Sequence, residues 1–177
     1  MKPGYGSRKG SAFERKLSKE LSLWWSDDKR NDLFWRTHSS GQLGTVSKKR
    51  MEYGDIMSID DESKPFMNKF HIEARHGLCI RVQDLIYKPK PSSSNMTGFI
   101  DEGVLGARDS NRHPIWFFRE QGKPIMTLMQ YEDFCFWIPK SAAENIVIAL
   151  FPGYELILFS FEDFKKHFDK GRIGGFD

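Results

Sequence analysis

Two acidic residues and one basic residue between positions 53 and 76 are placed so that they could perform chemistry together. In the stretch YGDIMSIDDESKPFMNKFHIEARH, Asp55 stands at the start of one strand-like segment and Glu73 lies inside a second. Side chains alternate between the two faces of a strand, so Arg75 shares the face of Glu73. Two carboxylates so placed suggest a divalent metal ion, and an enzyme that cuts phosphodiesters often needs such a pair beside a basic group.

The composition is that of a soluble globular protein. The chain has 177 residues, of which 39% are hydrophobic and 29% are charged, and this length fits one domain. No run approaches the roughly 20 apolar residues that a membrane span needs. Residues 1–10 are basic and lack an apolar segment, so they predict a flexible arm rather than a secretory signal, and the cytoplasm is the expected location. The remainder, residues 11–177, is expected to form a single domain.

The two cysteines, Cys79 and Cys135, lie far apart and form no CxxC pattern. Neither a disulfide framework nor a zinc site is therefore indicated. We expect both side chains to be buried as small hydrophobic groups.

An amphipathic helix is predicted over residues 12–25, because apolar residues recur at helical spacing from Phe13 to Trp24. Ser11 and Glu14 form the S-x-x-E pattern of a capping box at its start. Glu14 therefore has two readings. It caps the helix, or it is an acid on the first helix that leans over the site.

Strands and further helices follow in alternation along the chain. Three strands are expected at 33–37, 53–59 and 69–75, with a polar loop at 60–65 between the last two. In the third strand, Lys69, His71, Glu73 and Arg75 share one face. The later expectations are a helical segment at 78–87, a helix at 97–108, a hairpin of strands 115–119 and 125–129, strands at 134–138, 146–150 and 156–159, and a last helix at 161–169. This order predicts an α/β fold with a mixed sheet.

Further polar residues surround the central stretch. His71 could bind a metal, accept a proton or simply hydrogen-bond a neighbour. Arg36 lies between aromatic residues in a predicted strand and needs a partner. The net charge of +3 does not by itself indicate nucleic acid. Basic residues are nevertheless clustered, either as solvated surface or as contacts to DNA phosphates: Arg8, Lys9, Lys48, Lys49 and Arg50.

Five segments occur in an order that resembles a known nuclease pattern. They are GSAFER, WRTHSSG, GDI, FHIEAR and RHPIWFFREQGKPIMTLM, within residues 10–129. This order resembles the PD-(D/E)xK nuclease superfamily, and within it phage-type proteins of restriction-endonuclease-like or Holliday-junction-resolvase-like character. The resemblance implies a restriction-endonuclease-like core at about 11–130, with a central mixed β-sheet flanked by helices. Residues 131–177, with further strands and a helix, lie beyond it.

The resemblance also implies an activity and roles for particular residues. Asp55 and Glu73 match the acids that bind Mg²⁺ or Mn²⁺, and Glu14 matches an acid often found on the first helix. The implied activity is metal-dependent hydrolysis of DNA, on branched or recombination-type substrates, in the host cytoplasm if a phage encodes the chain. DNA is thus the expected partner. A homodimer is a further expectation, because enzymes that cut both strands are often dimers, although no heptad pattern indicates one.

Arg75 departs from the resembled pattern, which has lysine at this position. Burial can shift a lysine toward neutrality, whereas arginine stays protonated and cannot act as a base. Three alternatives follow. The enzyme is active with arginine in an electrostatic role, another lysine such as Lys69 or Lys123 replaces the missing one, or the protein binds DNA without cutting it. A protein-interaction factor is an alternative from another class.

Overall fold

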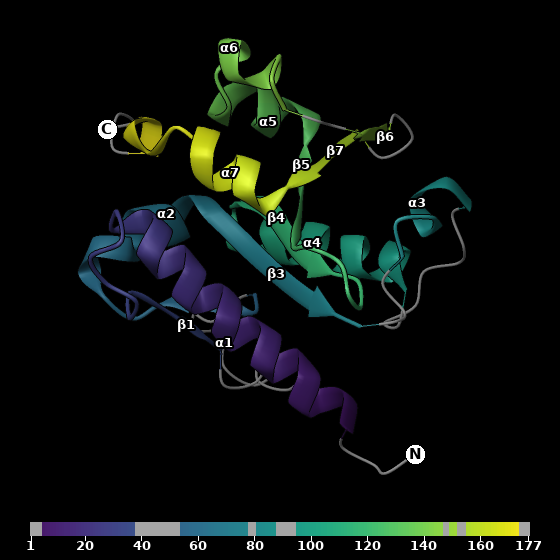
Figure 1. Cartoon of the computed structure of the whole chain (residues 1–177), viewed down its shortest axis with the longest axis horizontal. Coiled ribbons are helices and arrows are strands. Elements are labelled where there is room, and N and C mark those ends of the chain that lie inside the picture. Colours follow the sequence, from purple (N-terminus) through teal and green to yellow (C-terminus); the bar gives the residue numbers. More distant parts are fainter. Residues whose placement is uncertain are drawn as a thin grey trace.

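A mixed five-stranded sheet forms the centre of the molecule (Figure 1). The computed structural model describes residues 5–37, 54–77, 81–87, 95–146, 149–151 and 155–173, with the side chains of 5–9, 86–87 and 151 outside that description. The strand order is β3-β4-β5-β7-β6, in which β3 and β4 are parallel and the other neighbours are antiparallel. The strands are β3 (Phe70–His76), β4 (His113–Arg119), β5 (Met126–Gln130), β6 (Ala149–Phe151) and β7 (Leu156–Ser160).

Helices cover both faces of this sheet. In Figure 1, α1 (Tyr5–Trp25) and α7 (Phe161–His167) lie on the near face, and α4 (Met96–Ser110) lies behind β3 and β4. A small antiparallel sheet of β1 (Phe34–Arg36) and β2 (Ile56–Ser58) lies beside α1. The remaining elements are η1 (Asp61–Ser63), α2 (Lys64–Lys69), α3 (Asp84–Tyr87), α5 (Tyr131–Trp137), α6 (Lys140–Ala143) and η2 (Lys170–Ile173). The predicted α/β class with a mixed sheet is confirmed.

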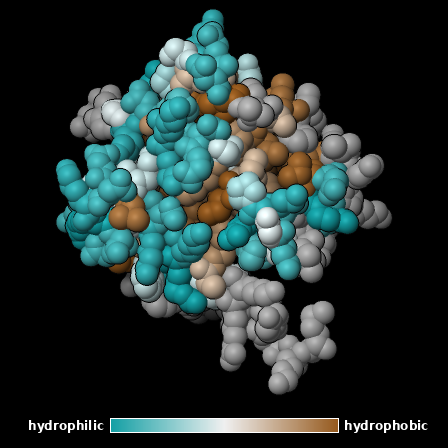
Figure 2. Space-filling view, viewed as in Figure 1, coloured by the Kyte–Doolittle hydropathy of each residue, from teal (hydrophilic) through white to brown (hydrophobic). Residues whose placement is uncertain are grey.

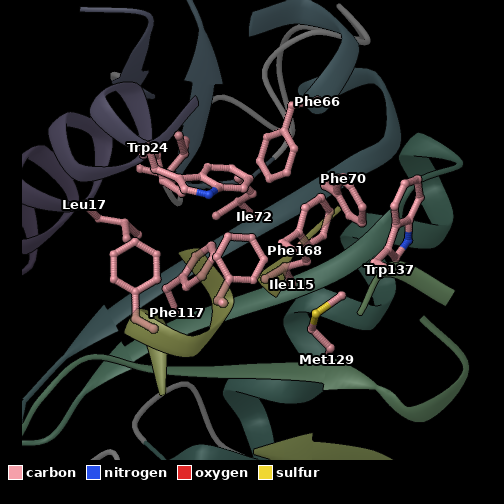
Figure 3. Close-up of a cluster of buried hydrophobic side chains, with 14 of the residues drawn as sticks. Leu17, Trp24, Phe66, Phe70, Ile72, Ile115, Phe117, Met129, Trp137 and Phe168 are labelled. Atoms are coloured by element: carbon pink, nitrogen blue, oxygen red, sulfur yellow. The ribbon is translucent and has the colours of Figure 1, made fainter. Parts of the chain in front are cut away.

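Alternation along β3 separates a hydrophobic face from a polar one. Phe70, Ile72 and Ala74 pack into the larger core with side chains of α1 and α7. Figure 3 shows this core, in which Phe70 and Ile72 lie among aromatic rings from several elements. His71 and Glu73 therefore point to the opposite face, toward α4. The amphipathic pattern of β3 thus places its polar residues together on one side of the sheet.

Helix α1 packs on the sheet through a hydrophobic stripe and a row of buried serines. Leu17 and Leu21 are fully buried, as the helical spacing predicts. On the face seen in Figure 2, hydrophilic side chains predominate, as expected where helices expose their polar sides. Ser22 has a second role, because its Oγ accepts hydrogen bonds from the backbone N–H groups of Leu33 and Phe34, at 3.1 and 3.0 Å. These bonds fix the start of β1 against α1.

The start of α1 differs from the prediction. The helix begins at Tyr5, so residues 5–10, expected in a flexible arm, are helical. Ser11 and Glu14 consequently lie inside the helix, and the capping-box reading of Glu14 is wrong. The pattern misled because S-x-x-E also occurs within helices, where it caps nothing.

Two further segments differ from expectation. Residues 134–138, predicted as a strand, fall largely within α5, and the predicted loop at 60–65 contains η1 and the start of α2. The first error arose because a short apolar run does not distinguish a strand from a helix.

Cys135 is exposed rather than buried, since it lies on the outer side of α5. Cys79 lies outside the described residues.

Candidate active site

Asp55 is fixed at the edge of β3 by backbone hydrogen bonds. Its N–H donates to the carbonyl of Ile72 at 2.8 Å, and its Oδ2 accepts from the N–H of Ala74 at 2.9 Å. Gly54 makes this close approach feasible, because its φ is +91° and a Cβ there would lie 2.6 Å from the Ile72 carbonyl oxygen. The N–H of Thr37, just after β1, donates to the carbonyl of Asp55 at 3.0 Å. Asp55 is therefore held between two segments at the level of Glu73.

The carboxyl groups of Asp55 and Glu73 interact in a largely buried site, in which Asp55 is 8% exposed and the side chain of Glu73 is 14% exposed. Burial, followed by the charge of Glu73, raises the pKa of Asp55 to about 8. Burial likewise raises the pKa of Glu73 to about 7, although the positive charge of Arg75 opposes that rise. Like charges removed from water repel strongly, so the pair favours holding a proton or a cation between its oxygens.

Glu14 and Arg36 flank this pair. Glu14 is 7% exposed, and its Oε2 accepts a hydrogen bond from Arg36 Nε at 3.0 Å. Burial and then the charge of Asp55 raise the pKa of Glu14, whereas Arg36 lowers it. The structure thus supports the reading of Glu14 as an acid that leans over the site. It also supplies the partner that the strand arginine was expected to need.

Arg75 is engaged by helix α4. Its Nη2 donates to Glu102 Oε2 at 2.5 Å, and its guanidinium carbon lies 4.7 Å from the centre of the Phe99 ring. The side chains of Arg75 and Glu102 are 26% and 44% exposed, so solvent and ligands can reach them. The guanidinium is consequently held next to Glu73 by an acid and an aromatic ring, in a position from which it could contact a phosphate.

His71 lies deeper on the same face of β3. Its side chain is 2% exposed, and its Nε2 lies 2.8 Å from Glu73 Oε1. Burial and then the charge of Arg112 lower the pKa of His71 to about 4, so the imidazole is neutral at physiological pH. Of the roles considered for His71, the structure favours a hydrogen-bonding neighbour.

Several predicted residues are not brought to this site. Lys69 ends α2 rather than beginning β3, and it lines a pocket of about 230 Å³ with His113 and Asp133. Lys69 precedes Glu73 by four positions, which corresponds to roughly 13 Å at 3.3 Å per residue along a strand. Lys123 lies exposed in the β4–β5 turn. The side chains of five predicted DNA contacts lie outside the described residues: Arg8, Lys9, Lys48, Lys49 and Arg50.

The donor atoms at the site suit a hard divalent cation. Among the residues that the structure describes, no group of three or more His, Cys, Asp or Glu side chains is arranged to hold a metal ion. Mg²⁺, however, commonly binds through one or two carboxylates and completes its shell with water and substrate phosphates. The adjacent buried carboxylates of Asp55 and Glu73 fit that requirement. The role of Glu14 as a metal ligand stays a prediction.

Sequence reasoning missed Glu102 and the glycines of α4. Gly103 and Gly106 face the sheet, where a Cβ would lie 2.1 Å from Trp116 Nε1 and 2.5 Å from the His71 ring, respectively. Phe99, Glu102, Gly103 and Gly106 recur at intervals of three and four residues. That helical spacing was the available signal for a helix face that packs closely on the sheet.

Comparison with family models decides the family. The model described as "Phage putative PDDEXK endonuclease" matches residues 5–174. The chain belongs to this family. The match extends beyond Met129, where the resemblance read from the sequence ended, so the C-terminal elements are part of the same PDDEXK endonuclease pattern.

Other comparisons of this PDDEXK chain add little. No curated protein matches it. Among solved structures, Hjc, a Holliday junction resolvase from the archaeal hyperthermophile Archaeoglobus fulgidus, aligns with a TM-score of 0.35 and 12% sequence identity, over 93% of this chain and 97% of that chain. None of the described helices is long and apolar enough to cross a membrane.

Proposed function

We propose that this chain is a metal-dependent DNA endonuclease that hydrolyses phosphodiester bonds with Mg²⁺ or Mn²⁺ in the host cytoplasm. The observation that carries the proposal is the buried carboxylate pair of Asp55 and Glu73, with the guanidinium of Arg75 on the same strand face. Membership of the PDDEXK endonuclease family supports the same reaction.

Each residue of the site has a distinct role in this proposal. Asp55 and Glu73 would hold the cation, which when bound polarises the phosphate and lowers the pKa of a coordinated water. Arg75 would bind a phosphate oxygen and offset its charge, but it stays protonated and cannot accept a proton. Glu14 would keep Arg36 in place beside the carboxylates. These assignments correspond to the alternative in which arginine acts only electrostatically.

The proposed substrate is recognised through its backbone. The sequence contains no pattern for reading base edges, so we propose a structure-selective or non-specific enzyme, with branched or recombination-type DNA among its substrates. Arg36 lies next to the carboxylate pair and is 22% exposed, so it is one candidate for a phosphate contact. The predicted contacts from Arg8, Lys9 and residues 48–50 would extend this surface.

A second candidate function is DNA binding without cleavage. The ion pair between Arg75 and Glu102 favours it, because a guanidinium already paired with an acid offsets less of the negative charge that develops at the phosphate during cleavage. Lys69 lies at the opposite end of β3 and offers no obvious replacement for a lysine in the site.

Cleavage assays on three DNA forms test the proposal. Supercoiled plasmid, linear duplex and a four-way junction are incubated with the protein and Mg²⁺, Mn²⁺ or EDTA. We expect cleavage with either metal, none with EDTA, and a loss of at least about 100-fold in Asp55→Asn and Glu73→Gln. Glu132→Gln, an exposed acid on α5, is the matched control and should cleave normally.

The same assay separates the two candidates. Salt-sensitive binding to DNA with no metal-dependent product would support the binding module. Absence of both binding and cleavage would reject both candidates and favour a protein-interaction factor. Equal cleavage by Asp55→Asn and the intact chain would reject this carboxylate pair as the active site.

A further inference from the structure

The hydrogen bond between His71 and Glu73 joins a buried imidazole to a carboxylate of the proposed metal site. The imidazole is almost fully buried, and its one described polar contact is to a carboxylate that we assign to the cation. A hydrophobic side chain would fill the same space without requiring a buried polar group.

Two glycines hold the imidazole ring in one place. A Cβ at Gly106 of α4 would lie 2.5 Å from both Cε1 and Nε2 of His71, and a Cβ at Gly54 would lie 3.4 Å from Cε1. Any larger residue at Gly106 would displace the ring or the helix, because contacts below 3 Å are not tolerated. The ring is thus confined between α4 and the segment that carries Asp55, with Nε2 directed at Glu73.

The surroundings also assign the donor of the hydrogen bond. Nδ1 of His71 is buried and has no hydrogen-bond partner among the described residues. A neutral imidazole carries one N–H and one bare nitrogen. The tautomer with hydrogen on Nε2 donates to the carboxylate and leaves only the acceptor Nδ1 unsatisfied, whereas the other tautomer would bury an unpaired N–H at Nδ1 and turn the bare Nε2 toward a carboxylate oxygen. Nε2–H is therefore the donor.

We propose that His71 is a positioning residue for the metal site. It donates Nε2–H to Glu73 Oε1 and thereby fixes the orientation of the carboxylate that binds the cation. The inference rests on the proposed function, because it presupposes that Asp55 and Glu73 bind a metal ion. Hydrogen bonds to a ligating group from outside the coordination shell typically change metal affinity by 10–100-fold when they are removed.

Direct measurement of Mn²⁺ binding tests this role without relying on activity. Mn²⁺ is titrated into the full chain and the free ion is followed by electron paramagnetic resonance. We expect about 10–100-fold weaker binding in His71→Leu, which has no donor. We expect binding within about threefold of the intact chain in His71→Gln, because a glutamine amide can donate from a similar reach.

Matched controls separate positioning from packing. His113→Leu removes a histidine that pairs with Asp133 rather than with Glu73, and it should bind Mn²⁺ normally. Thermal unfolding without metal verifies that each variant is folded, and His71→Met replaces His71→Leu if the latter does not fold. Retained binding in the donor-free variant, or equal losses in His71→Gln and His71→Leu, would overturn the inference. Absence of Mn²⁺ binding in the intact chain would instead reject the proposed metal site itself.

Discussion

The carboxyl group of Asp55 is buried beside a second acid, and this determines how the metal-free protein responds to pH. Its pKa rises from 3.8 to about 8 on folding, mainly through burial and then through Glu73. Between these values the folded state keeps a proton that the unfolded chain releases. The contribution of Asp55 to the free energy of unfolding is therefore greatest below pH 3.8 and declines as pH rises to about 8.

The substitution Asp55→Asn should accordingly stabilise the metal-free protein at pH 8. Asparagine has no charge to bury and can still accept the N–H of Ala74 through Oδ1. We expect a gain of about 1–3 kcal/mol at pH 8 and a smaller gain at pH 5, measured by urea unfolding at both pH values. If Asp55→Asn is less stable than the intact chain at pH 8, then the ionised carboxylate of Asp55 does not destabilise the folded protein.

Arg75 can be tested by two substitutions at the same position. Arg75→Ala should lower cleavage by about 100-fold, because it removes the charge that we assign to the phosphate. Arg75→Lys keeps the charge but lacks the planar fork that can hold Glu102 and a phosphate together, so we expect about a tenfold loss in the plasmid assay. An increase in cleavage by Arg75→Lys would contradict this role. It would show that the reaction is limited by the absence of a lysine at position 75.

At the scale of elements, Ser22 of α1 holds the start of β1 through hydrogen bonds to its backbone. Ser22 Oγ accepts two backbone N–H groups, from Leu33 and Phe34, inside the core. Ser22→Ala would leave both donors buried and unpaired, and it should reduce the free energy of unfolding by about 1–3 kcal/mol. Ser18→Ala is the control, because the Oγ of Ser18 donates a hydrogen bond to the carbonyl of Glu14 within the same helix. Equal stability losses in the two variants would exclude the anchoring role.

Helix α4 approaches the sheet through its glycines, and this packing is also testable. A Cβ at Gly103 would lie 2.1 Å from Trp116 Nε1, so Gly103→Ala should force the helix or the indole to move. We expect a loss of about 1–3 kcal/mol in thermal or urea unfolding. Leu105→Ala, on the exposed side of the same helix, should change stability by less than about 0.5 kcal/mol. Unchanged stability in Gly103→Ala would mean that the close contact is not required.

At the scale of the whole molecule, the sequence correctly predicted features that follow from local periodicity, namely which side chains share a face of a strand or a helix. Alternation in β3 correctly placed His71 and Glu73 together, and helical spacing correctly predicted the core stripe of α1. Contacts between distant segments were not accessible in this way. Glu102 meets Arg75 only because α4 crosses β3, and Asp55 reaches Ala74 only because Gly54 permits close approach.

The incorrect secondary-structure predictions came from sequence patterns that are compatible with more than one local structure. The apolar run at 134–138 fits a strand or a helix, and α5 forms because Phe134 and Trp137 both pack into the core one turn apart. The S-x-x-E motif at Ser11 fits a helix start or a helix interior. The single domain expected over residues 11–177 stays a prediction, and β6 and β7 complete the same sheet as β3, β4 and β5.

We propose that Asp55 and Glu73 together bind the metal ion that supports DNA cleavage, and a Mn²⁺-soaked crystal of the full chain tests this, with diffraction recorded where manganese scatters anomalously. We expect an anomalous peak in contact with both carboxylates, and its loss in Asp55→Asn. A well-ordered site with no peak between these carboxylates, or a peak that persists in Asp55→Asn, would show that the pair does not hold the ion.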